Sequence, residues 1–199
     1  ACAGAGKTTT RKGVASARPE RGLYLAFNKS NAQEARSKLA LTKCVAETMH
    51  ALAYSTVREF IGSPYQINAK TVRESGILNR FNMPRSKGWN EYRIAAAVGR
   101  TIAAFSASAD PDIQASHGAE AIVSAIGDPD FMKAGEKKSE AMLAVQLLSG
   151  PLAEVAQAYW VHLVEQEQKM SHDMYLKMLD LDDTLRQEAF RPFRYLVLD

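Results

Sequence analysis

The stretch "ACAGAGKTTT", residues 1–10, decides the fold that we expect for this chain. Gly4 and Gly6 carry no Cβ, so the backbone around them can turn until successive N–H groups point at one anion. Residues 7–17 contain no proline, and we expect a helix there whose N-terminal dipole adds positive charge at the same point. The stretch therefore predicts a loop that holds a phosphate group.

The residues that follow Gly6 complete a nucleotide site. The stretch matches the P-loop pattern G-x-x-x-x-G-K-[ST], with Ala1 in place of the first glycine, which is acceptable where φ is negative. In such a loop the Lys7 ammonium contacts the β- and γ-phosphates, and the Thr8 hydroxyl coordinates Mg²⁺. The residues expected to line the nucleotide are Ala3, Gly4, Ala5, Gly6, Lys7, Thr8 and Thr9.

The far end of the chain carries a matching feature. "FRYLVLD" (193–199) is an apolar run that ends in Asp199, where a P-loop protein needs a carboxylate to hold the metal through water. Taken singly, the glycine loop could be a chance turn and Asp199 an ordinary residue at a strand end. Together they predict a nucleoside triphosphate site with Mg²⁺. Lys7, Thr8 and Asp199 are its expected catalytic residues, and Thr8 and Asp199 are its metal ligands.

Strands and helices alternate in the first part of the chain. "LYLAF" (23–27) and "CVAET" (44–48) are short apolar runs typical of buried parallel strands. Residues 28–39 and 49–62 carry helical patterns, and the second ends before a Gly-Ser-Pro breaker. This order predicts an α/β core with a parallel sheet.

The middle of the chain has a different character. From 65 to 189 no strand-like run stands out, and segments such as 91–105 and 151–168 carry apolar residues at helical spacing. We therefore expect an all-helical insertion over 65–189. The sheet domain would consist of 1–64 and 190–199.

Composition limits the possible classes of protein. Hydrophobic residues make up 46% and charged residues 24%, as in soluble globular proteins, and no apolar run approaches the roughly 18 residues of a membrane span. Cys2 and Cys44 give neither a disulfide framework nor a metal spacing, so we expect reduced thiols inside a cell. The net charge of +3 permits an anionic partner without requiring one. A chain that starts within a phosphate loop is expected to be a piece of a longer protein.

Five stretches together resemble one family. They are "ACAGAGKTTT" (1–10), "YLAFNKSNAQEA" (24–35), "TMHALAY" (48–54), "SHDMYLK" (171–177) and "FRYLVLD" (193–199). They are similar to segments of superfamily 1 DNA helicases of the UvrD/Rep type, and in particular of the F-box DNA helicase branch. In that family the last strand leads into D-E-x-Q-D, of which Asp199 is the first residue here.

The resemblance implies a motor that hydrolyses ATP to move 3′ to 5′ along single-stranded DNA and to open junctions with duplex DNA. It implies a RecA-like core, domain 1A, with 65–189 as domain 1B. Its implied partners are DNA, further helicase domains of the same chain, and repair or recombination proteins, with no membrane. Its implied location is the cytoplasm of a bacterial or phage-infected cell, or a eukaryotic nucleus. The residues that fall where the family contacts DNA are Phe27, Asn28, Lys29, Thr48, His50 and His172.

These positions also make physical sense without the family. Binding a single strand of any sequence needs basic groups for its backbone and flat side chains for its bases. Phe27, Asn28 and Lys29 follow a strand, at the edge where open α/β sheets bind ligands. The alternatives are that Phe27 packs in the core, and that His50 and His172 make local structural hydrogen bonds. Lys177 could contact a phosphate or be a solvated side chain.

Two other functions compete with the motor. A P-loop enzyme of another class, such as a kinase or a GTPase-like switch, would explain Lys7, Thr8 and Asp199 but leaves 27–29 and 48–54 unexplained. A protein-docking module on a nucleotide-binding fold is the third possibility, although the intact G-K-T argues against it. The family's catalytic glutamate would come after Asp199, so we expect this chain to bind nucleotide weakly and to hydrolyse almost none.

Overall fold

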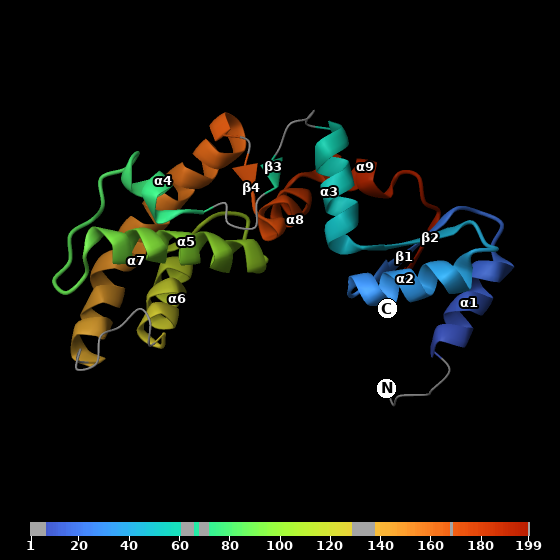
Figure 1. The fold of residues 1–199 in the computed structure, drawn as a ribbon, viewed down its shortest axis with the longest axis horizontal. Helices are drawn as coiled ribbons and strands as arrows, with labels where there is room; N and C mark the ends of the chain where they lie inside the picture. The colour runs from blue at the N-terminus through green and yellow to red at the C-terminus, as the bar shows by residue number, and fades with distance from the viewer. Residues whose placement is uncertain (1–6, 61–65, 68–71, 129–137, 168, 199) are drawn as a thin grey trace. The chain divides into compact units, whose positions relative to one another are not determined.

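The protein is mixed α/β and mainly helical, with a small parallel sheet (Figure 1). The chain forms two compact units: unit 1 comprises Ala1–Ser63 and Met178–Asp199, and unit 2 comprises Pro64–Lys177. No helix in the described part of the chain is long and apolar enough to cross a bilayer. The computed structural model describes residues 7–60, 66–67, 72–128, 138–167 and 169–198.

The sheet of unit 1 contains β1 (Gly22–Ala26), β2 (Cys44–Thr48) and β5 (Tyr195–Leu198), in the order β2-β1-β5. All three strands run parallel. The register pairs Ala26 with Thr48 and Leu25 with Leu198, so the three strands end side by side. We refer to this side as the carboxyl edge and to the opposite side as the amino edge.

Helices cover one face of this sheet. α1 (Lys7–Ala17) and α2 (Lys29–Leu39) contribute small apolar side chains, including Ala15 and Ala32, to a core around Tyr24, Ala26 and Ala46. α3 (Met49–Phe60) follows β2 and packs against α9 (Asp183–Phe190). The helix expected over 7–17 and the strand expected over 44–48 are confirmed residue for residue. The strand expected over 23–27 lies at 22–26, which leaves Phe27 beyond its end.

Unit 2 is built mainly from helices. They are α4 (Glu74–Leu78), α5 (Glu91–Ala107), α6 (Ala115–Ile126), α7 (Lys138–Val161), a π-helical segment (His162–Glu167) and the first part of α8 (His172–Leu181). The expectation of an all-helical insertion is wrong in one respect, because β3 (Gln66–Ile67) and β4 (Lys169–Met170) form a short parallel pair. Strands of two residues are too short to show a periodic pattern in the sequence.

Two boundaries in this region also differ from expectation. α7 runs through Pro151, although the sequence suggested that a helix begins there. A proline lacks the N–H that would bond within the helix, and its ring crowds the preceding turn. The buried Leu148 and Leu152 anchor the helix on both sides of it. The second boundary between the units lies after Lys177 rather than after residue 189, because α9 packs against α3.

A glycine sets the packing of the edge strand β5. Gly22 pairs with Tyr195, and a Cβ at Gly22 would overlap the Tyr195 ring. We expect Gly22→Ala to lower the free energy of unfolding of unit 1 by about 1–3 kcal/mol, the usual effect of overpacking. Urea denaturation measures this. Gly13→Ala in α1 is the matched control, because a Cβ there meets nothing within 4 Å. This substitution should leave the free energy of unfolding unchanged or raise it. Equal effects of the two substitutions would contradict the packing argument.

Two titratable side chains near Gly22 make the stability of unit 1 depend on pH. Burial raises the pKa of the Cys44 thiol, and burial raises the pKa of the adjacent Tyr195 phenol. As the pH rises, the unfolded chain loses these protons before the folded chain does, so the folded state becomes less stable in alkali. Between about pH 8 and pH 10, near the ordinary pKa of a thiol, Cys44→Ala should lose less stability than the unsubstituted chain. If the free energy of unfolding falls equally with pH in both proteins, the Cys44 thiol makes no such contribution.

Candidate nucleic-acid interface

The ends of β1 and β2 bring two groups of predicted site residues together. Ala26 and Thr48 are paired in the register, so the residues that follow them lie side by side at the carboxyl edge. Phe27 is 87% exposed, which excludes the alternative that it packs in the core. Burying a phenylalanine side chain is worth about 1.5–3 kcal/mol. Phe27 contributes none of this to the fold, but its ring is available to a ligand.

Two polar side chains at this edge begin helices. The Asn28 Oδ1 accepts a hydrogen bond from the Asn31 N–H at 2.8 Å, as the N-cap of α2. The Thr48 Oγ1 accepts one from the Ala51 N–H at 3.2 Å, in the first turn of α3. These oxygens are therefore used within the chain. By accepting these hydrogen bonds, the two side chains fix the starts of α2 and α3 at the carboxyl edge, so the positive ends of two helix dipoles lie next to each other there.

Two further predicted residues lie in the first turns of these helices. Lys29 is the first residue of α2 and His50 the second residue of α3, and both are exposed. The Arg36 Nε donates to the Ala46 carbonyl oxygen at 2.8 Å, which fixes α2 against β2. The carboxyl edge thus presents a flat aromatic ring, an ammonium group, an imidazole and two helix N-termini. This combination suits a chain of phosphates with stackable bases.

His172 belongs to unit 2, on α8. Its Nδ1 lies 2.7 Å from the Tyr175 hydroxyl, and the two rings meet edge to face with their centroids 5.7 Å apart. The local contact with Tyr175 agrees with the structural alternative for this histidine. Its role in DNA binding stays a prediction.

The expected nucleotide site falls mainly outside the described residues. Ala3, Gly4, Ala5, Gly6 and Asp199 lie outside them, as do the side chains of Lys7 and Thr8, whereas Thr9 is exposed on α1. β5 ends at Leu198 on the carboxyl edge. Residues 18–21 join the end of α1 to the start of β1 at the amino edge. No group of three or more acidic, histidine or cysteine side chains that could hold a metal occurs among the described residues.

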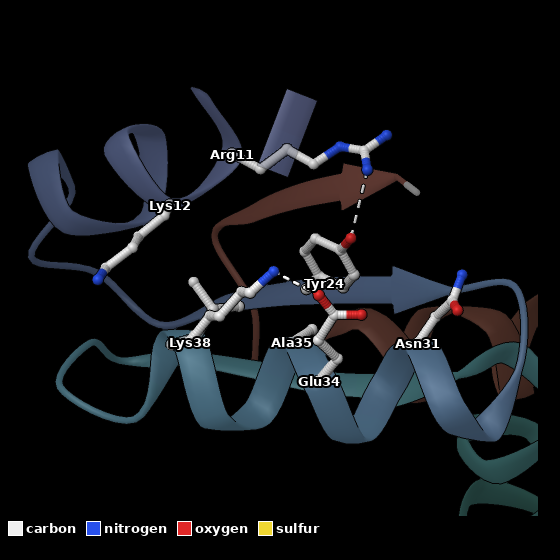
Figure 2. A pocket seen from close by; sticks show the side chains of 8 residues that line it. Arg11, Lys12, Tyr24, Asn31, Glu34, Ala35 and Lys38 are labelled. Atoms are coloured by element: carbon white, nitrogen blue, oxygen red, sulfur yellow. Dashed lines mark hydrogen bonds and ion pairs between the residues drawn. The ribbon is translucent and has the colours of Figure 1, made fainter. Parts of the chain in front are cut away.

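A basic hollow lies between α1 and α2 (Figure 2). It measures about 140 Å³, and Arg11 and Lys12 face it from α1 while Lys38 faces it from α2. The Arg11 Nη1 donates to the Tyr24 hydroxyl at 3.4 Å, and Glu34 forms an ion pair with Lys38. The sequence predicted no site at these cations. The adjacent Arg11 and Lys12, on the helix that follows the predicted phosphate loop, were the available signal.

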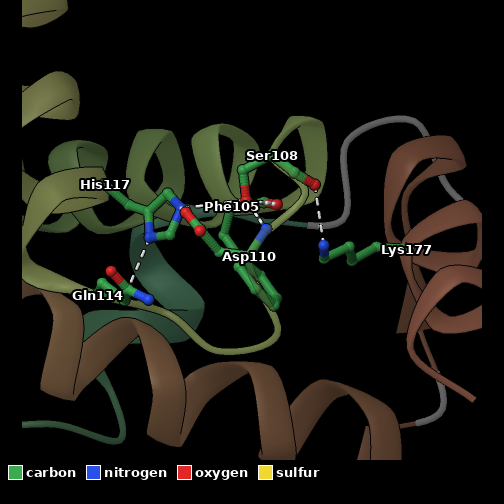
Figure 3. A network of polar contacts seen from close by, with 6 residues as sticks. All are labelled: Phe105, Ser108, Asp110, Gln114, His117 and Lys177. Carbon is green, nitrogen blue, oxygen red and sulfur yellow. Dashed lines mark hydrogen bonds and ion pairs between the residues drawn. The ribbon is translucent and has the colours of Figure 1, made fainter.

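The sequence left two roles open for Lys177, contact with a phosphate and a solvated side chain, and the structure shows neither. Its side chain is 2% exposed, and its Nζ donates to the Ser108 carbonyl oxygen at 2.9 Å over the Phe105 ring (Figure 3). His117 lies in the same network, with its Nδ1 accepting from the Gln114 N–H at 2.9 Å. Lys177 therefore fastens α8 to the end of α5 within the core of unit 2.

No protein-family model matches this chain, and no curated protein matches it. What the chain can bind is therefore judged from its own side chains.

Proposed function

We propose that the chain is the ATP-binding and strand-contacting part of a DNA motor of the superfamily 1 type, with a RecA-like P-loop core in unit 1. The observation that carries the proposal is the exposed ring of Phe27 at the carboxyl edge. One base stacks on this ring, while neighbouring phosphates meet Lys29 and the starts of α2 and α3. A kinase or a GTPase-like switch offers no reason for a phenylalanine 87% exposed at this place.

The same edge is suited to the nucleotide. Lys7 would hold the β- and γ-phosphates, and Thr8 and Asp199 would hold Mg²⁺, which neutralises charge on the phosphates when it is bound. The start of α1 adds backbone N–H groups and the positive end of its dipole. β5 ends at Leu198, directly before Asp199, on the edge that also carries Phe27. Nucleotide and DNA would therefore share one side of the sheet, as a motor that couples the two requires.

The experiment that tests the proposal is Phe27→Ala. We expect its affinity for fluorescein-labelled dT30, measured by anisotropy, to fall by about 5–150-fold, because one stacked base is worth about 1–3 kcal/mol. Phe27→Trp should keep the affinity, since it preserves a flat ring. Phe60→Ala is the matched control, because Phe60 is also an exposed phenylalanine of unit 1, at 49%. A Phe27→Ala protein that loses thermal stability but keeps its affinity for dT30 would rule out the stacking role.

A further inference from the structure

Each strand of the unit 1 sheet is preceded by a cation. Arg21 comes before β1, Lys43 before β2 and Arg194 before β5. The Arg194 N–H donates to the Arg21 carbonyl oxygen at 2.8 Å, and the Gly22 N–H donates to the Lys43 carbonyl oxygen at 3.2 Å. Because neighbouring strands lie about 4.8 Å apart, these three residues form a line across the amino edge. With Arg18 we call them the amino-edge row.

Aromatic rings hold two of these guanidinium groups in place. The Arg18 Cζ lies 5.4 Å from the centroid of the Tyr195 ring, and the Arg21 Cζ lies 5.3 Å from that of Phe193. A guanidinium that rests on an aromatic face keeps its N–H donors at its rim, where they can form paired hydrogen bonds to a phosphate. All four cations of the row are exposed. The row therefore presents ordered donors to solvent.

Among the described residues, no carboxylate forms an ion pair with a cation of the row. Glu20 is the acidic residue beside the row. Like charges on neighbouring strands destabilise a sheet. The row thus weakens the fold slightly, and no described carboxylate offsets this. An external polyanion would relieve this repulsion.

We propose that the amino-edge row binds the phosphodiester backbone of DNA as a second contact. The proposal rests on the proposed function only in assigning the first contact to the carboxyl edge. The five residues of β1 separate the two edges by about 16 Å at about 3.3 Å per residue, so different nucleotides occupy them. A phosphodiester backbone suits the row, because the planar guanidinium groups of its arginines match the geometry of a phosphate with paired hydrogen bonds. The exposed Leu41, near Lys43, is the feature that a peptide would use instead.

The test compares two double variants of the full chain. Arg21→Gln with Arg194→Gln removes two cations of the row, and Arg85→Gln with Lys87→Gln removes two exposed cations of unit 2 as the matched control. Binding of dT30 is measured from 50 to 300 mM NaCl. Each lost phosphate contact lowers the slope of log affinity against log salt by about 0.7. We expect the row variant to lower the slope by about 1.4 and the affinity at 100 mM NaCl by about tenfold or more, with no such change in the control.

Further measurements separate the possibilities. Arg21→Lys with Arg194→Lys keeps both charges and should keep the salt slope, which distinguishes lost charge from lost folding. A row variant that has the same salt slope as the control overturns the proposal. The proposal is also overturned if a polyglutamate peptide displaces dT30 from the unsubstituted chain but not from Leu41→Ser. Phe27→Ala removes stacking without charge and leaves the slope unchanged. If Phe27→Ala has no effect while the row variant still lowers the slope, the row stands and the proposed function fails.

Discussion

Gly118→Ala is expected to lower the free energy of unfolding of unit 2 by about 3 kcal/mol, at the upper end of overpacking effects. α6 and α7 approach each other so closely here that a Cβ on Gly118 would overlap the Ser149 carbonyl oxygen. This oxygen belongs to the backbone of α7, so no side-chain rotation can make room. The two helices must move apart, which loosens the packing of the buried Leu148 and Leu152.

A second glycine of the same helix provides the control. Gly127 caps α6, and a Cβ there would meet its neighbours at ordinary contact distances of 3.6 Å and more. Gly127→Ala should therefore change stability by no more than about 0.5 kcal/mol. Urea denaturation followed by circular dichroism measures both substitutions. If Gly118→Ala unfolds at the same urea concentration as Gly127→Ala, α6 and α7 do not pack as closely as described.

Lys7→Ala is expected to reduce the binding of Mg²⁺-ATP by about tenfold or more, because a hydrogen bond to a charged group is worth about 1.5–3 kcal/mol. Its affinity for dT30 should stay within about twofold, since the proposed strand contacts lie with Phe27 and not with the predicted phosphate loop. Fluorescence of a labelled ATP analogue measures the first quantity and anisotropy the second. Omitting Mg²⁺ should weaken ATP binding to the unsubstituted chain as well.

Lys12→Ala is the matched control for this experiment. Lys12 is an exposed lysine of the same helix, and it faces the basic hollow between α1 and α2. It should leave ATP binding nearly unchanged. If Lys12→Ala weakens ATP binding as much as Lys7→Ala does, the nucleotide is held by the general positive charge of α1 or by the hollow. The P-loop assignment would then be wrong.

The sequence predicted the sheet of unit 1 well for a physical reason. A strand buried on both faces, such as β1, is a continuous apolar run, and such runs are visible without knowledge of their neighbours. The helix at 7–17 was visible because no proline interrupts it. The strand order could not be predicted in the same way, because the pairing of Gly22 with Tyr195 depends on tertiary contacts.

The candidate site was only partly visible in the sequence. Phe27 was identified as a candidate, but its exposure depends on where β1 ends, and a shift of one residue decides whether a side chain is buried. Lys177, unlike Phe27, is buried, although a lysine rarely is. Only the fold supplies the Ser108 carbonyl oxygen that accepts its hydrogen bond. The amino-edge row was hidden because its members are far apart in the sequence and meet only through the sheet.

The pairing of β1 with β5 has a consequence for biosynthesis. β1 lies near the beginning of the chain and β5 near its end, so their hydrogen bonds join segments that are synthesised at very different times. Unit 2 is one continuous segment and can fold while the ribosome still holds the residues of β5. The sheet must wait for the residues of β5, and until then the nascent β1 and β2 expose apolar surface that a chaperone would need to shield.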